Sequence, residues 1–352
     1  MKTSLLNDTT EDIRLAADII RGGGLVAFPT ETVYGLGADA LNESAVSKVY
    51  EAKGRPSDNP MIVHIAEFED LYKLTESVTD DMKHLMDAFW PGPMTMILRR
   101  SSIVPDVTTG GLDTVGVRLP SNEVARKLIK EAGCPLAAPS ANISGRPSPT
   151  TAEHVIYDLY GRVDAIICGE DCDYGIESSV IDMTGEVPTI LRPGAITREM
   201  FSEALVKDVA MDKSLYQRPE KLIDPEQNAS SDYKDAEPGD SDEQDFRPKS
   251  PGMKYKHYAP EAEMIVFEGE HQSVIRAIDE EEKRLSEQGK SVYRLSFTDE
   301  QIAAHELFAK LREADSSGAD VILAEALPEK GLGFSVMNRM LKSAGYNVRR
   351  IK

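Results

Sequence analysis

The sequence predicts an α/β protein in two parts: a large twisted mixed sheet with flanking helices, then a smaller Rossmann-like parallel unit. Three observations predict it. Short apolar strands and amphipathic helices follow one another in irregular order up to residue 208. Residues 209–260 then contain a long stretch rich in Glu, Asp, Ser and Pro. From residue 261 to 352, strands and helices alternate regularly, which is the pattern of a parallel sheet covered by helices.

The large part begins with a helix. Thr9 and Thr10 precede two acids as capping residues, apolar side chains recur at helical spacing, and the glycines 22–24 end the helix. Similar patterns predict the other elements of this part. The expected strands are 25–28, 61–65, 94–98, 114–118, 136–138, 165–168, 179–182 and 189–192, and the expected helices are 43–53, 78–89, 121–132 and 151–159.

The segment 209–260 separates the two parts. Between residues 219 and 246 it has almost no apolar side chains, so it cannot bury enough surface to offset the entropy of ordering. We therefore expect a flexible acidic linker. Beyond it, the small part is expected to have strands 264–267, 291–296, 320–324 and 347–351 and helices 271–287, 299–314 and 334–344.

The composition narrows the function classes. The chain has 352 residues, 41% of them hydrophobic, which is ample for two cores. Its net charge of −20 argues against broad nucleic-acid binding, which depends on many phosphate contacts. No apolar run approaches the roughly 18–20 residues of a membrane span, and the first residues do not read as a signal peptide. We expect a cytoplasmic protein.

The cysteines do not suggest a framework of disulfide bonds. Cys134, Cys168 and Cys172 are few and odd in number, which fits a reducing compartment. Cys168 and Cys172 have a spacing that could suggest a zinc site, but no third or fourth ligand follows nearby in the sequence. Partly buried thiols are the interpretation that we favour.

A cationic loop follows the helix 43–53. Lys53-Gly54-Arg55 is unusual in so acidic a chain, and Ser140-Ala141-Asn142 places short hydrogen-bonding side chains behind a proline. The loop predicts a site for an anion such as a phosphate or carboxylate. The alternative is that Lys53 and Arg55 only stabilise the carboxyl end of the helix, where cations are favoured.

Two further arginines point to the same kind of site. Arg118 and Arg192 each end a strand that should be buried, so each needs a protein acid or a ligand anion as its partner. Together with Lys53 and Arg55 they predict one polyanion-binding cleft. His64 also ends an apolar strand, where a lone histidine is more often structural than catalytic.

Nucleotide-binding fingerprints are absent or misplaced. Gly35-Leu36-Gly37 imitates a dinucleotide motif, but residues 29–34 separate it from the preceding strand, so the tight strand–turn–helix geometry fails. We expect the whole segment 28–39 to form a loop, which is either an ordinary structured turn or the rim of a small-molecule pocket, since loops at the ends of α/β strands commonly bind ligands. No P-loop motif occurs, and no serine or cysteine nucleophile has an obvious base. Catalysis by positioning and charge stabilisation therefore fits better than covalent catalysis.

These residues resemble the YrdC-like family in its long two-domain form. Lys53-Gly54-Arg55 with Ser140-Ala141-Asn142 matches the K-x-R…S-x-N signature of that family. The resemblance covers about residues 10–205, and the segment 250–260 with the small unit resembles the second half of the long form. Four further motifs match in order: Phe28-Pro29-Thr30-Glu31-Thr32-Val33-Tyr34-Gly35-Leu36, Phe89-Trp90-Pro91-Gly92-Pro93, Gly116-Val117-Arg118-Leu119-Pro120 and Leu191-Arg192-Pro193-Gly194.

The resemblance implies an activity. The family makes L-threonylcarbamoyladenylate and pyrophosphate from L-threonine, bicarbonate or CO₂, and ATP. Its product serves the downstream tRNA threonylcarbamoyl-transferase machinery, which modifies the adenosine beside the anticodon; we expect no tight direct binding of tRNA by this acidic chain. By resemblance, threonine contacts Thr32, His64, Arg118, Ala138 and Ser178. ATP contacts Arg55, Asn59, Thr114, Ser140, Asn142, Ser148 and Arg192, with Lys53 in the same basic pocket.

The chemistry of the residues agrees with this resemblance. Arg118 suits a carboxylate, and Lys53, Arg55 and Arg192, with Mg²⁺ as the expected cofactor of ATP, would neutralise charge on the phosphates. No protein ligand for Mg²⁺ is predicted. Because a carbamate hydrolyses readily, a closed site would help, and the segment 250–260 is a candidate lid. The lid residues would be Pro251, Gly252, Met253, Tyr255, His257 and Tyr258.

Two other functions remain open on the residues alone. A carbamoyl-transfer protein could use the same fold on another acceptor, although the additional modules of such proteins are not seen here. A catalytically silent RNA-binding or regulatory module would call for a broadly basic face, which the acidic composition disfavours.

Overall fold

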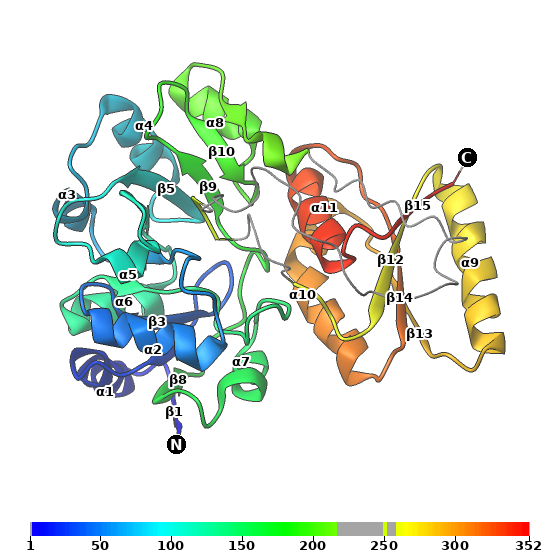
Figure 1. Ribbon diagram of the computed structural model, residues 1–352, viewed down its shortest axis with the longest axis horizontal. Helices are drawn as coiled ribbons and strands as arrows, with labels where there is room; N and C mark the ends of the chain where they lie inside the picture. The colour runs from blue at the N-terminus through cyan, green and yellow to red at the C-terminus, as the bar shows by residue number, and fades with distance from the viewer. Residues whose placement is uncertain (1, 217–248, 252–257, 352) are drawn as a thin grey trace, which may run out of the picture.

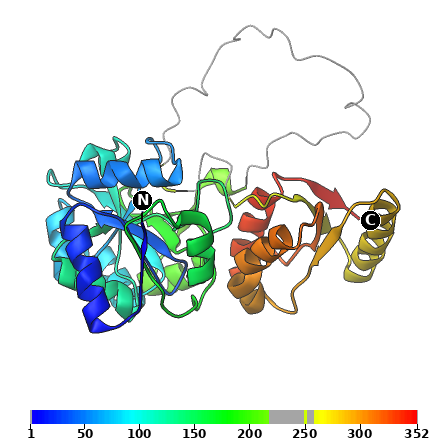
Figure 2. The same ribbon diagram turned by 90° about the horizontal axis from the view of Figure 1, so that it is seen from below.

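The computed structural model describes residues 2–216, 249–251 and 258–351. Two α/β units lie side by side (Figures 1 and 2). The large unit is built on an eleven-stranded mixed sheet and the small unit on a four-stranded parallel sheet. The predicted fold class is confirmed in both parts.

The large sheet has the strand order β1-β8-β2-β3-β7-β4-β6-β5-β9-β10-β11. Parallel and antiparallel neighbours are mixed along it: β4 pairs parallel with β6, whereas β5 pairs antiparallel with β6. Its strands are β1 (Ser4–Leu6), β2 (Val26–Phe28), β3 (Gly35–Asp39), β4 (Ile62–His64), β5 (Met94–Arg99), β6 (Thr114–Arg118), β7 (Leu136–Ala137), β8 (Ala165–Ile167), β9 (Ser179–Asp182), β10 (Thr189–Arg192) and β11 (Ala210–Met211).

Local signals set the ends of the helices in this unit. Thr9 caps α1 by accepting a hydrogen bond from the Asp12 backbone N–H, as the sequence predicts. Gly54 ends α2 in the left-handed conformation, with φ of 63°. The helices are α1 (Thr10–Arg21), α2 (Glu43–Lys53), α3 (Leu71–Leu74), α4 (Asp80–Phe89), α5 (Asp106–Thr109), α6 (Glu123–Ala132), α7 (Ala152–Leu159) and α8 (Arg198–Leu205), with 3₁₀ turns at Phe68–Asp70 and Lys213–Leu215.

The prediction that residues 28–39 form one loop is wrong in its second half. β3 begins at Gly35 and pairs antiparallel with β2. Glycine is depleted in strands, so the sequence pattern concealed this one. The glycines are needed for packing: a Cβ at Gly37 would lie only 2.7 Å from the ring of Phe28. The short elements β1, α3, α5, α8 and β11 were also not predicted.

The small unit follows the predicted alternation. Its strands are β12 (Glu263–Glu268), β13 (Val292–Leu295), β14 (Val321–Glu325) and β15 (Val348–Arg350), all parallel in the order β13-β14-β12-β15. Side chains alternate along β12, so Ile265 and Phe267 pack with α9 while Met264 and Val266 pack toward α10 and α11. These helices are α9 (His271–Glu287), α10 (Glu300–Ser316) and α11 (Gly331–Ser343).

The two faces of the small sheet have different surroundings. α10 and α11 lie toward the large unit, and α9 lies on the outer face, in both views (Figures 1 and 2). The core that α10 and α11 form with the sheet also includes Val33 and Ile176 of the large unit. The contact between the units is therefore partly apolar.

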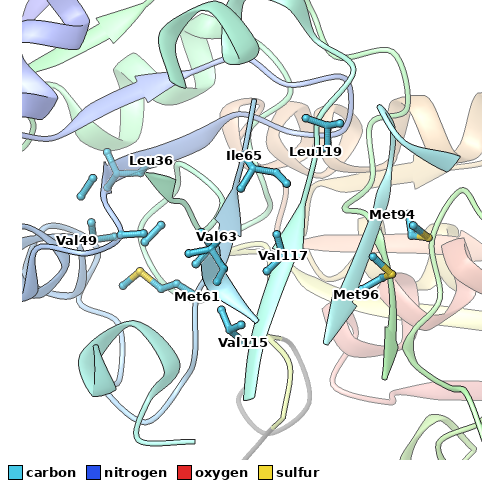
Figure 3. Packing of buried hydrophobic residues seen from close by; sticks show 14 of the residues in the cluster. Leu36, Val49, Met61, Val63, Ile65, Met94, Met96, Val115, Val117 and Leu119 are labelled. Carbon is cyan, nitrogen blue, oxygen red and sulfur yellow. The ribbon is translucent and has the colours of Figure 1, made fainter. Parts of the chain in front are cut away.

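The main core of the large unit fills the face of the sheet around β4, β5 and β6. Val63, Val117 and Met96 meet there on adjacent strands, and Val49 of α2 packs close by (Figure 3). This core fixes β4 and β6 side by side, with His64 and Arg118 directly opposite each other in the register.

Most of the predicted linker, residues 217–248 and 252–257, lies outside the described residues. β11 extends the large sheet to Met211, just past residue 208. In the described part of the chain, no helix is long and apolar enough to cross a membrane.

Candidate functional site

A pocket lies on the large unit where β2, β4, β6, β9 and β10 end or begin. Its walls bring together residues that are far apart in the sequence. All five residues predicted to contact threonine line it: Thr32, His64, Arg118, Ala138 and Ser178. Three of the residues predicted to contact ATP also line it: Arg55, Ser140 and Arg192.

Arg118 is held by the loop between β2 and β3. Its Nη2 donates to Glu31 Oε1 at 2.7 Å, and its Nη1 donates to Thr32 Oγ1 at 2.8 Å. The pair with Glu31 is buried on both sides. The partner that a strand-end arginine requires is therefore a protein acid. Glu31 was not predicted as a site residue, although an acid next to Thr32 was a usable signal.

His64 is a neutral residue in this pocket. Its ring is buried, and Nδ1 lies 3.2 Å from the Ile62 carbonyl oxygen, a contact in which Nδ1 carries the proton. Burial and the neighbouring cation Arg118 lower the pKa of His64 to about 3. It can therefore offer hydrogen bonds at neutral pH without adding charge.

Arg192 and Ser178 form the opposite wall. Arg192 donates through Nε to the Ser178 carbonyl and through Nη2 to Ser178 Oγ, both at 3.0 Å. Thr95 Oγ1 lies 2.7 Å from the same hydroxyl. Residues assigned by resemblance to different substrates thus touch each other here.

Arg55 lines the pocket, and Asn59 lies next to it without lining the pocket. Arg55 holds the carbonyl groups of Asn59 and Pro60, and burial lowers its pKa to about 10, so it remains a cation at neutral pH. The Asn59 amide is buried and makes no hydrogen bond within the described residues. Buried polar groups are normally paired, so this amide is suited to a ligand.

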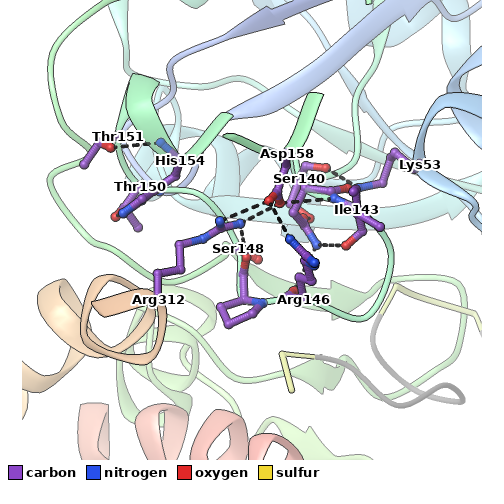
Figure 4. A network of polar contacts seen from close by, with 12 residues as sticks. Lys53, Ser140, Ile143, Arg146, Ser148, Thr150, Thr151, His154, Asp158 and Arg312 are labelled. Carbon is purple, nitrogen blue, oxygen red and sulfur yellow. Dashed lines mark hydrogen bonds and ion pairs between the residues drawn. The ribbon is translucent and has the colours of Figure 1, made fainter. Parts of the chain in front are cut away.

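Lys53 does not line the pocket. It is the last residue of α2, but its buried Nζ donates to the carbonyl groups of Ser140 and Asn142 (Figure 4). Asn142 is also directed inward: its amide binds the carbonyls of Ile143 and Arg146, and Ser140 Oγ donates to its Oδ1. Lys53 thus holds the Ser140–Asn142 loop in place, and a helix cap alone does not account for it.

Ser148 and Thr114 are also buried, and neither of them lines the pocket. Ser148 Oγ donates to Glu177 Oε1 at 2.6 Å, and Thr114 begins β6. Glu177 itself lines the pocket and was not predicted. The other lining residues that the sequence reasoning did not name as site residues are Thr30, Val33, Tyr34, Gly35, Ile62 and Pro139.

Two residues of the predicted lid segment line the pocket, Pro251 and Tyr258. Burial and the nearby Glu177 carboxylate raise the pKa of Tyr258 to about 12. The other predicted lid residues, Gly252, Met253, Tyr255 and His257, lie outside the described residues.

The described walls do not supply a carboxylate cage for a metal ion. Glu177 is the lining carboxylate, and it is paired with Ser148 and with Arg339 of the small unit. No cluster of three or more His, Cys, Asp or Glu suited to a metal occurs among the described residues. Mg²⁺ commonly keeps several waters and binds substrate phosphates, so these walls suit Mg²⁺ only as a complex with a polyphosphate.

Two family models match the chain in succession. One, described as "Telomere recombination", matches residues 18–194. The other, described as "Threonylcarbamoyl-AMP synthase, C-terminal domain", matches residues 196–345.

Similar proteins match over nearly the whole length. A threonylcarbamoyl-AMP synthase of Pyrococcus abyssi is 46% identical, with 96% of each chain covered. One of Bacillus subtilis is 41% identical, with 99% of this chain and 97% of the relative covered. Among solved structures, P. abyssi Sua5 complexed with L-threonine is 44% identical, has a TM-score of 0.87, and covers 100% of this chain and 99% of its own.

Proposed function

This chain belongs to the threonylcarbamoyl-AMP synthase family, and we propose that its pocket joins L-threonine, bicarbonate or CO₂ and ATP into L-threonylcarbamoyladenylate, with release of pyrophosphate. The product serves the threonylcarbamoylation of the adenosine beside the anticodon of tRNA. The observation that carries the proposal is that all five residues predicted to contact threonine and three of those predicted to contact ATP line one pocket.

The threonine half of the reaction takes place beside Arg118. Glu31 and Thr32 fix the orientation of the Arg118 guanidinium. Because Arg118 still lines the pocket, the guanidinium can bind a carboxylate there. The neutral His64 and the hydroxyls of Thr32 and Ser178 offer short-range hydrogen bonds to the amino acid. The amine of threonine combines with bicarbonate to give a carbamate and water.

The nucleotide half takes place beside Arg55 and Arg192. An oxygen of the carbamate attacks the α-phosphorus of ATP, the bond to the β,γ-unit breaks, and pyrophosphate leaves. The two arginines stabilise the charge that develops on the phosphates, and Mg²⁺ enters with ATP. The buried amide of Asn59, which has no hydrogen-bond partner within the described residues, supports a contact with a polar group of the nucleotide.

Omission of single substrates tests the function. Pyrophosphate release and the adenylate are measured with ATP, Mg²⁺, threonine and bicarbonate together, and then with each left out in turn. The proposal requires release to depend on threonine and bicarbonate. Release that is independent of threonine would refute it.

The Arg55→Ala variant tests the cationic loop. Because this charge is lost from the phosphate side, we expect kcat/KM for ATP to fall by about 10²-fold or more, with an unchanged circular dichroism spectrum. Lys48→Ala on the solvent side of α2, whose Nζ donates to the Gly23 carbonyl, is the matched control. Equal activity of Arg55→Ala and wild type would show that the loop merely ends α2.

A further inference from the structure

One side chain of the small unit reaches the back of the pocket. Arg339 of α11 is fully buried. Its Nε donates to Glu177 Oε2 at 3.2 Å, its Nη2 donates to the Glu177 carbonyl at 3.4 Å, and its Nη1 donates to the Pro193 carbonyl. One turn earlier on α11, Ser335 Oγ donates to the Gly194 carbonyl at 2.8 Å. α11 thus holds two separate segments of the large unit.

Both segments carry pocket residues. Glu177 lines the pocket and directly precedes Ser178, and Pro193 directly follows Arg192. Arg192 donates hydrogen bonds to the carbonyl and the hydroxyl of Ser178. Arg339 therefore lies directly behind the wall that presents Arg192.

The buried Glu177 carboxylate in this wall needs cations near it. Burial alone would raise the pKa of Glu177, but Arg339, Arg192 and the Ser148 hydroxyl together bring it below its ordinary value, so the carboxylate stays ionised. A buried carboxylate needs a charged partner, and two arginines are near it. Because Arg339 donates to Glu177 directly, Arg192 can keep its guanidinium on the pocket side.

We propose that Arg339 is a positioning residue for this active site. By pairing with Glu177 and holding the Pro193 carbonyl, it prevents Arg192 from turning onto Glu177 and keeps that cation available to the phosphates of ATP. The small unit then contributes to the reaction through α11 without touching a substrate. This inference rests on the proposed function of the pocket.

The test is a double-mutant cycle on the full-length protein with Arg339→Met, Glu177→Gln and the two combined. In Arg339→Met, the Glu177 carboxylate loses its guanidinium partner and competes for Arg192, so we expect the KM for ATP to rise about tenfold or more, with a smaller change for threonine. In the double variant the competing charge is gone, and the KM for ATP returns to within about threefold of Glu177→Gln alone. Arg284→Met, on the outer helix α9, is the matched control and keeps wild-type kinetics.

Two outcomes would overturn the inference: a wild-type KM for ATP in Arg339→Met, or a double variant no better than Arg339→Met. If Arg339→Met does not fold, the double variant and Arg339→Lys carry the same comparison, since the first lacks both charges and the second keeps the cation. Calorimetric titration with ATP and Mg²⁺, without threonine, measures the same loss of affinity. The titration tests this inference separately from the proposed function. The proposed function fails if the wild-type protein forms no adenylate, whatever the affinity of the variants for ATP.

Discussion

At the scale of single residues, the pocket depends on buried groups whose charge state is set by their neighbours. His64 shows this most clearly, because burial and Arg118 hold its pKa near 3. An unfolded histidine takes up a proton below pH 6.5, whereas the folded one does not until about pH 3. The unfolded state therefore binds more protons in this window, so folding stability falls as the pH decreases through it.

This difference predicts an acid-sensitive contribution. At pH 5 the neutral His64 should cost the native state about 2 kcal/mol relative to pH 7.5, and His64→Gln should lack that cost. The measurement is urea unfolding of both proteins at the two pH values. His84→Gln, which removes an exposed histidine of α4, is the control. An identical loss of stability in wild type and His64→Gln would contradict the assignment.

At the scale of elements, α7 and α10 are joined by a second buried contact between the units. Arg312 of α10 donates to Asp158 of α7 at 2.8 Å and to the Pro147 carbonyl at 2.6 Å (Figure 4). Asp158 also accepts the backbone N–H of Ile143, beside the Ser140–Asn142 loop. The pair therefore connects the small unit to the loop that brings Ser140 to the pocket.

Breaking this pair should be more damaging than removing it. Asp158→Leu leaves Arg312 buried without its carboxylate, so we expect the free energy of unfolding to fall by about 3 kcal/mol or more. Asp158→Leu with Arg312→Met should recover at least half of that loss, because the buried guanidinium that lost its carboxylate is removed as well. Denaturant unfolding measures both. Glu123→Gln, in the exposed pair with Lys127, is the control and should change stability by less than about 1 kcal/mol. A double variant as unstable as Asp158→Leu would contradict the argument.

The elements also show what the sequence could predict. Helices with a cap and a terminal glycine, such as α2, and strands of apolar residues, such as β6, have local signals and were placed correctly. β3 has no such signal, because Gly35 and Gly37 serve the ring of Phe28 on another strand. Contacts of this kind depend on register, which the local pattern does not contain.

The residues of the candidate site also differ in how much the local sequence could predict. Arg118 and Arg192 were predicted because a cation at the end of a buried strand is unusual in any fold. Glu31 stands beside Thr32 and Glu177 beside Ser178, a signal that was available but not used, whereas Arg339, far along the chain, carries no local mark of a shared site. The role of Glu31 becomes visible only when the loop after β2 is seen against the end of β6, and the role of Glu177 with Arg339 only when the two units are seen in contact.

At the scale of the whole molecule, the two units are in close contact at Gly175. Its backbone has a φ of 69°, and a Cβ built there would lie 2.1 Å from the His305 carbonyl oxygen of α10. The next residue, Ile176, belongs to the core that α10 and α11 form. No side chain fits at Gly175 without moving α10 away from the large unit.

We therefore expect Gly175→Ala to open the contact between the units. Arg339 and Arg312 would then lose their partners together, so activity should fall by about tenfold or more, while small-angle scattering shows a larger radius of gyration. Gly289→Ala is the matched control, because Gly289 has a similar φ of 77° but open space around its Cβ position. That variant carries the backbone strain without the collision, so it should keep wild-type dimensions and activity. If both variants lose activity to the same extent, backbone strain accounts for the loss. If both keep wild-type activity and dimensions, the close approach of the units at Gly175 does not control the site.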